Sequence, residues 1–106
     1  MTEKNTEFLV SLQEIQKQVY RNKLNKGFNV TDINKEFCLL YGEVSEAYEA
    51  WRKKQPSVGE ELADIAIYLL GLAEILGIDL GEEISRKIVI NEHRTYETVD
   101  GVLTRV

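Results

Sequence analysis

The sequence predicts an all-α fold, a four-helix bundle-like domain that completes its core by oligomerisation. Four stretches carry apolar residues at helical spacing, and β-strand signals are nearly absent before residue 97. The only proline, Pro56, separates the second stretch from the third. A chain of 106 residues fits one domain, 1–106, whose own core is modest, so association with further copies would help it.

The first two helices are predicted at about residues 7–26 and 32–54. Gly27 is a suitable stop for the first, and Thr31 is a favourable N-cap for the second. Apolar positions of the second helix step alternately by four and three, which predicts one continuous buried face: Ile33, Phe37, Leu40, Val44, Ala47 and Trp51. Cys38 lies in this apolar pattern and is expected in the core.

The third helix is predicted to begin at Ser57, which indicates a capping box with Glu60, and to end near Leu76. Its apolar residues cover nearly every side, which is typical of a buried helix. Three other short helices can hardly enclose it, so we expect a homodimer or homotetramer that shares this helix across its interface.

The fourth helix is predicted from a cap at Asp79 to about Tyr96. Residues 97–106 contain Asp100-Gly101 between short β-branched runs. This tail is expected to be a small hairpin, an arm onto a partner, or a frayed end.

Composition narrows the classes of partner. The formal net charge of −5 argues against a nucleic-acid polymer, because such partners need a basic face. Residues 1–5 are polar and carry no signal peptide, and the apolar stretch 62–76 is too short and too charged to cross a membrane. A single cysteine fits a reduced compartment, so we expect a cytoplasmic protein without a membrane partner.

Two acidic pairs follow one another, each with i,i+3 spacing: Glu43 with Glu46, then Glu61 with Asp64. At this spacing the side chains of a pair share one helix face, so two adjacent helices would bring four carboxylates together. Two carboxylates about 4 Å apart repel by roughly 4 kcal/mol at an effective dielectric of 20. Oxygen ligands without His or Cys suit Mg²⁺ or Mn²⁺, so the pairs indicate a metal site.

Each pair also has a structural explanation. Glu43 and Glu46 fit a solvated helix face, and Glu61 fits a first turn that favours acidic residues. Asp64 is harder to explain in this way, because its apolar surroundings predict burial. Glu60 competes with Glu61 as a ligand, but only Glu61 is spaced i,i+3 from Asp64.

A basic row is predicted on the fourth helix, where Lys87, Asn91 and Arg94 are spaced i, i+4, i+7. Alone, this row fits a solvated surface. Beside an acidic metal site it would hold a polyphosphate, because the cation bridges the phosphates and the basic groups neutralise the remaining charge. The lone His93 is expected at the surface.

The ordered set of two acidic pairs and the basic row resembles the MazG-like, all-α nucleoside triphosphate pyrophosphohydrolases, over about residues 29–96. The resemblance implies hydrolysis of an NTP or dNTP to the monophosphate and pyrophosphate. It also implies a metal set and a phosphate-binding set. The metal ligands for Mg²⁺ would be Glu43, Glu46, Glu61 and Asp64, and the phosphate contacts would be Lys87, Asn91 and Arg94.

In the mechanism that we expect, one of the four carboxylates, Glu46 or Glu43, orients the attacking water as general base. The resemblance also implies a role for Tyr68, which matches an aromatic position that packs on the base in some members. Trp51 is a second candidate for stacking, although its position on the apolar stripe favours the core. Ser45 stands where many members have Gly, and no residue of the first helix matches a base contact.

Two other readings from different classes stay open. A non-catalytic helical module for oligomerisation would use the same apolar third helix, and a nucleotide-sensing module would bind without turnover. The base and sugar preference is not predicted.

Overall fold

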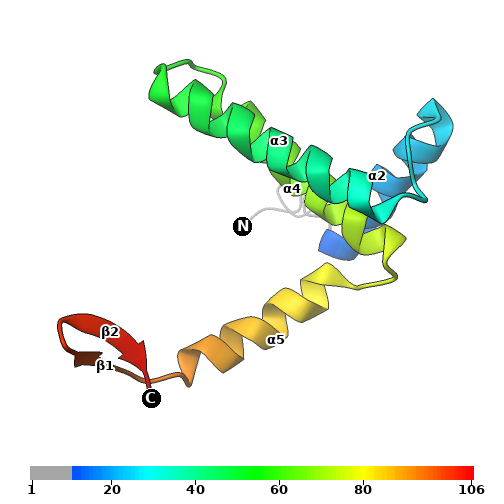
Figure 1. The fold of residues 1–106 in the computed structure, drawn as a ribbon. Coiled ribbons are helices and arrows are strands. Elements are labelled where there is room, and N and C mark those ends of the chain that lie inside the picture. The colour runs from blue at the N-terminus through cyan, green and yellow to red at the C-terminus, as the bar shows by residue number, and fades with distance from the viewer. Residues whose placement is uncertain (1–10) are drawn as a thin grey trace, which may run out of the picture.

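The computed structural model describes residues 11–106 and confirms the all-α class. Among these residues it has four helices: α2 (Leu12–Lys26), α3 (Ile33–Arg52), α4 (Val58–Ile75) and α5 (Leu80–Glu92). A two-stranded antiparallel hairpin follows, formed by β1 (Tyr96–Val99) and β2 (Val102–Arg105) (Figure 1). The expected beginning of the first helix at residue 7 lies outside the described residues.

Local side-chain bonds set where the first two of these helices begin and end. The Ser11 hydroxyl accepts a hydrogen bond from the Glu14 amide at α2, and Gly27, with φ 73°, ends the helix as predicted. The N-cap of α3 is Asp32 and not Thr31, because the Asp32 carboxylate accepts from the Lys35 amide at 3.1 Å. The chain leaves α3 at Arg52, two residues before the predicted end.

Of the two N-caps predicted for α4 and α5, only the cap of α5 is present. Ser57 precedes α4, but its side chain makes no capping bond, so the predicted capping box with Glu60 is wrong. The backbone ψ of Ser57 is 4°, far from the extended conformation that lets an N-cap hydroxyl reach the next turn. Asp79 caps α5 as predicted, accepting from the Glu82 amide at 3.1 Å.

The tail forms the hairpin, the first of its three predicted alternatives. Asp100 and Gly101 have φ values of 51° and 79°, as a two-residue type I′ turn requires. Because Tyr96 begins β1, α5 ends at Glu92, short of the predicted end.

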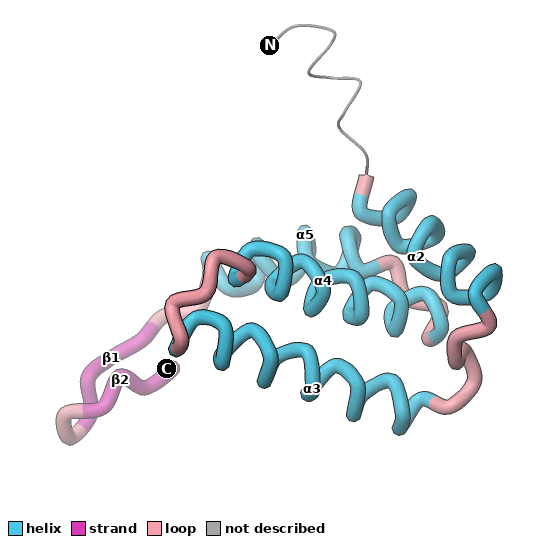
Figure 2. Tube along the Cα trace, turned by 90° about the horizontal axis from the view of Figure 1, so that it is seen from above, coloured by secondary structure: helices cyan, strands magenta, loops and turns pink. Residues whose placement is uncertain are grey.

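The core lies where α4 packs between α3 and α2. α3 and α4 run side by side in both views, and α2 crosses near the C-terminal end of α4 (Figures 1 and 2). The buried apolar residues come from two helices: Ala47 and Ala50 of α3, and Leu70, Leu72 and Ala73 of α4. At the α2–α4 crossing, a Cβ on Gly71 would lie 3.2 Å from Val19 Cγ1 and 3.3 Å from two carbons of the Lys23 stem. Glycine therefore permits this close approach.

Gln16 ties α2 to the segment that joins α4 and α5. Its side chain, in a residue only 2% exposed, donates to Glu74 Oε1 at 2.9 Å and to the Ile78 carbonyl at 2.6 Å. Its own carbonyl oxygen accepts from the Leu80 amide at 3.2 Å. The position at which α5 starts is therefore fixed by a side chain of α2.

Beyond that junction α5 and the hairpin extend away from the other helices (Figure 1). No residue of α5 is buried, and its main packing partner among the described elements is α2. The Cα radius of gyration is 17.6 Å, against about 13 Å for a compact domain of this length. Within residues 11–106, no helix is both long and apolar enough to cross a bilayer.

This open arrangement corrects several predictions of burial. On α3, Phe37, Val44 and Trp51 are exposed, and so is Cys38. α4 is buried only near its C-terminal end, while Leu62 and Ile67 lie at the surface. The reason is that α3 packs along only one side of α4, and α2 covers only the second half, so the other sides of the first half are uncovered by any described element. Apolar faces of this size fit the predicted oligomer, which stays a prediction.

Candidate functional site

Three acidic side chains converge where α3 and α4 run side by side. One carboxylate oxygen from each of Glu43, Glu46 and Glu61 lies within 4.8 Å of the others. The i,i+3 spacing puts Glu43 and Glu46 on one face of α3, and the first turn of α4 brings Glu61 opposite to them. We call these three residues the acidic cluster.

Asp64 lies outside this group and is exposed, so the prediction that it is buried is wrong. Its exposure has the same cause as that of Leu62, because α2 does not reach the start of α4. Its negative charge nevertheless acts on Glu43, where it helps to raise the pKa of the carboxyl. Asp64 therefore borders the acidic cluster without joining it in a single chain.

The electrostatics of the acidic cluster are unfavourable without a cation. Glu43 Oε2 and Glu61 Oε2 are buried and have no hydrogen-bond partner among the described residues. Burial raises the pKa of Glu43, and the negative charges of Glu46, Asp64 and Glu61 raise it further. Closely spaced carboxylate oxygens with unused lone pairs suit a hard divalent cation, so the residues present fit Mg²⁺ or Mn²⁺.

The basic row does not meet the acidic cluster within one chain. Lys87 and Asn91 are exposed on α5, Arg94 follows directly after the helix, and α5 diverges from α3 in Figure 1. Among residues 11–106, no ion pair joins Lys87 or Arg94 to an acidic residue of α3 or α4. His93 is exposed as predicted, and its Nδ1 lies 2.8 Å from the Val89 carbonyl oxygen.

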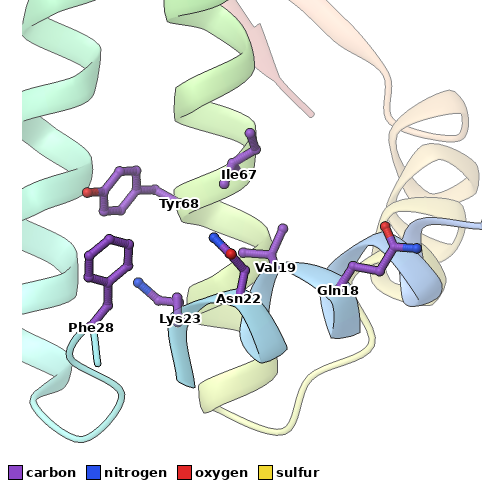
Figure 3. A pocket seen from close by; sticks show the side chains of 7 residues that line it. All are labelled: Gln18, Val19, Asn22, Lys23, Phe28, Ile67 and Tyr68. Carbon is purple, nitrogen blue, oxygen red and sulfur yellow. The ribbon is translucent and has the colours of Figure 1, made fainter. Parts of the chain in front are cut away.

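A pocket of about 290 Å³ opens beside Tyr68, between α2 and α4 (Figure 3). It is lined by Gln18, Val19, Asn22, Lys23, Phe28, Ile67 and Tyr68. Partial burial raises the pKa of the Tyr68 hydroxyl, and the Glu43 carboxylate is the next largest cause. Tyr68 therefore connects the acidic cluster to this pocket.

The sequence does not predict that α2 contributes to this pocket. Asn22 and Lys23 look like ordinary surface residues of an amphipathic helix, and only the α2–α4 crossing gives them a shared cavity. Trp51, by contrast, does not line the pocket. It is 66% exposed at the last turn of α3, with its ring centroid 6.2 Å from that of Tyr48.

These features define an all-α domain that gathers carboxylates from two adjacent helices next to a partly aromatic pocket. A family model described as the MazG-like family matches residues 29–102, and the chain belongs to this family. The matched segment contains α3, α4, α5 and most of the hairpin. The expectation drawn from the order of the acidic pairs is therefore confirmed at the level of the family.

One similar protein and one similar solved structure support this family assignment. A dATP/dGTP diphosphohydrolase of Salmonella phage PMBT28 is 40% identical over 40 residues, which are 38% of this chain and 14% of that protein. A solved structure of a cyanophage S-2L MazG-like pyrophosphohydrolase, bound to dGDP and three catalytic Mn²⁺ ions per active site, is similar with a TM-score of 0.66 and 25% identity. That likeness covers 92% of this chain and 99% of the cyanophage chain.

Proposed function

We propose that this protein is a nucleoside triphosphate pyrophosphohydrolase that converts an NTP or dNTP to the monophosphate and pyrophosphate with Mg²⁺ or Mn²⁺. The observation that carries the proposal is the acidic cluster, in which Glu43 and Glu61 each hold a buried, unpartnered oxygen. Family membership and the names of the two similar proteins support it. The Mn²⁺ ions of the cyanophage structure show which kind of cation such a site accepts there.

In this proposal the acidic cluster binds the cation, and Asp64, which lies beside the cluster, is the fourth ligand. A bound divalent cation neutralises phosphate charge and makes water a better nucleophile. Glu43 or Glu46 would take the proton from the attacking water as general base, and burial and the neighbouring carboxylates raise the pKa of Glu43, which favours proton uptake. The bond that breaks joins the α- and β-phosphates, and pyrophosphate leaves.

The remaining phosphate charge is assigned to Lys87, Asn91 and Arg94, as the resemblance implies. Since α5 diverges from α3 within one chain, we propose that these residues reach the site of a second copy. The exposed apolar side chains of α4 and α5, among them Leu62, Ile88 and Ile90, are the faces that a homodimer or homotetramer would cover. The cytoplasmic location stays a prediction.

The base is assigned to the pocket beside Tyr68. Phe28 supplies a second aromatic ring, and Val19 and Ile67 supply apolar walls (Figure 3). Stacking on aromatic side chains tolerates any base, so these contacts supply affinity more than choice. Trp51 is the weaker of the two predicted stacking residues, because it lies outside this pocket.

The test is pyrophosphate release from a panel of NTPs and dNTPs with Mg²⁺ and with Mn²⁺. We expect turnover by the native chain and a loss of at least a hundredfold in Glu43→Gln. Asp64→Asn is expected to lose less, since Asp64 only borders the acidic cluster. Glu60→Gln is the matched control, because Glu60 is an exposed first-turn neighbour of Glu61.

Four outcomes would argue against parts of the proposal. Folded protein that releases no pyrophosphate from any nucleotide contradicts the enzyme. Nucleotide binding without release supports the sensing module, and neither binding nor release supports the oligomerisation module. Equal activity of Glu43→Gln and the native chain contradicts the assigned site.

Assembly of the site from two copies has its own experiment. Glu43→Gln and Arg94→Ala chains, each nearly inactive alone, are mixed after unfolding and refolding together. If α5 acts on a partner's site, mixed oligomers contain sites with both residues intact, and activity returns to roughly a quarter of the native value. No recovery indicates that the two residues serve one chain's site.

A further inference from the structure

A buried ion pair joins Lys23, which lines the pocket, to Glu36. Lys23 Nζ is 2.6 Å from Glu36 Oε1, and the two side chains are 9% and 1% exposed. Glu36 Oε2 accepts a hydrogen bond from the Asn29 amide at 3.0 Å, which fixes the carboxylate. Asn29 is fixed in turn: its Nδ2 donates to Glu36, and its Oδ1 accepts from the Asp32 backbone amide at 3.0 Å. The position of the Lys23 ammonium is therefore set by a chain of three residues.

The ammonium also faces the pocket. It lies 5.2 Å from the centroid of the Tyr68 ring, and Lys23 lines both the pocket beside Tyr68 and an adjoining cavity of about 260 Å³. Figure 3 shows the Lys23 nitrogen directed toward Phe28 and Tyr68, the two aromatic residues of the pocket. The ammonium lies over the face of the Tyr68 ring, so a base stacked on Phe28 is the one that would have the ammonium near its edge.

Stability alone is a weak explanation for this pair. Taking two charges out of water is costly, and apolar residues in their place are often neutral or stabilising. An ammonium has three N–H bonds, and Glu36 is the one ion-pair partner of Lys23 among residues 11–106. The Lys23 side chain is 9% exposed and lines the pocket, so a ligand there would meet an ammonium shielded from most water, where a charged hydrogen bond is strong.

We propose that Lys23 is a specificity-determining residue that selects bases with a carbonyl oxygen at the edge facing it, namely 6-oxopurines among the purines. An ammonium only donates, so it binds a carbonyl oxygen and is mismatched with an exocyclic amino group, which also donates. Asn22, beside Lys23 on the pocket wall, offers both a donor and an acceptor to the neighbouring position. This inference rests on the proposed function, because it names the substrate class of the same site.

dITP and dATP form a sharp substrate pair, because their bases differ along one edge only. Hypoxanthine has a carbonyl at C6 and a protonated N1, whereas adenine has an amino group at C6 and an unprotonated N1. We expect kcat/KM of the native chain to favour dITP by roughly ten- to a hundredfold, the range of one hydrogen bond to a charged group. In the double variant Lys23→Met/Glu36→Gln the ratio should fall to about one. Removing both charges avoids leaving Glu36 buried and unpaired.

Two controls separate recognition from folding. Glu36→Gln alone keeps the ammonium, so the preference for dITP should persist. Lys17→Met changes an exposed lysine of the same helix and should leave the ratio unchanged. Equal kcat/KM for dITP and dATP in the native chain, or an unchanged preference in the double variant, would overturn the proposal.

Binding measurements keep this inference apart from the proposed function. Calorimetric titration with dIMP and dAMP needs no turnover and should show the same preference and the same loss in the double variant. If the native chain hydrolyses nothing yet prefers dIMP, the proposed function fails and the role of Lys23 stands. If it hydrolyses nucleotides and binds dIMP and dAMP equally, the reverse holds.

Discussion

The part of the chain built from α2, α3 and α4 differs from α5 and the hairpin in how each is held. In the first part, buried residues from all three helices contact one another, and the acidic cluster and the pocket both lie there. α5 has no buried residue and is anchored at its start through Gln16. The difference teaches that one chain by itself brings together the acidic cluster and the pocket, whereas the basic row of α5 stays apart from both.

The largest expected difference between the two parts is in the free energy of unfolding. Leu72→Ala removes a side chain that is 3% exposed and should cost about 2–5 kcal/mol at any protein concentration. Ile88→Ala on α5 removes a side chain that is 51% exposed, and in a single chain it should cost less than about 1 kcal/mol. Urea unfolding at several protein concentrations measures both.

The dependence of these unfolding free energies on protein concentration shows whether a second copy covers α5. A cost for Ile88→Ala that grows with protein concentration indicates that a second copy covers α5. An equal, concentration-independent cost for both variants would contradict the division into two parts.

A divalent cation should stabilise the first part only. At a free Mg²⁺ concentration of about 100 Kd the native chain should gain about 2.7 kcal/mol, read from thermal unfolding. Glu43→Gln should lose most of this gain, and Arg94→Ala should keep it. A gain that survives in Glu43→Gln would place the cation elsewhere.

The same experiment has a pH dependence with a defined sign. Because the folded-state pKa of Glu43 is raised, the cation-free protein gains stability from this group at low pH and loses it as pH rises through that pKa. Protons and the cation compete for the same oxygens, so the gain from Mg²⁺ should shrink as pH falls from neutrality toward 4.5, the ordinary pKa of the group.

Gln16→Leu tests the anchor of α5. It leaves the Ile78 carbonyl and the Leu80 amide without their partner and should cost about 1–3 kcal/mol. Hydrogen exchange should quicken at the start of α5 more than in α3. Gln13→Leu, an exposed neighbour on α2, is the control, and equal effects of the two would contradict the role of Gln16.

The smallest effect is expected at the surface of α3. Arg52 donates two hydrogen bonds to Glu49, at 3.2 and 2.9 Å, and lowers the pKa of that carboxyl. A lowered pKa contributes at neutral pH and is lost as pH falls, but water screens exposed pairs. Glu49→Gln should therefore leave the urea midpoint nearly unchanged, and a marked shift would contradict this.

Much of the fold follows from local chemistry and could be predicted. Gly27 and Asp79 act within one turn of themselves, and Asp100-Gly101 forms the turn that its residue types favour. The i,i+3 spacing likewise put Glu43 and Glu46 on one face. These features depend only on residues that lie close together in the sequence, so the sequence alone predicts them.

The remaining features of the fold and the site depend on how the helices pack against one another. Trp51 and Cys38 carry apolar spacing, yet no described element lies over them. Gln16 binds Glu74 across 58 residues, and Lys23 meets Glu36 only because the chain turns between α2 and α3. Polar residues of this kind are usually solvated, so nothing in their local pattern distinguishes the few that a helix crossing buries.

Gly71 gives this crossing an evolutionary consequence. Any side chain there would displace Val19 or the stem of Lys23, and with the stem the ammonium at its end. A substitution at a position that touches no ligand would then change which base is preferred. In a selection for altered base preference, we expect changes to arise at position 71 as well as in the pocket wall. The close packing of α2 on α4 at Gly71 sets the position of the Lys23 ammonium.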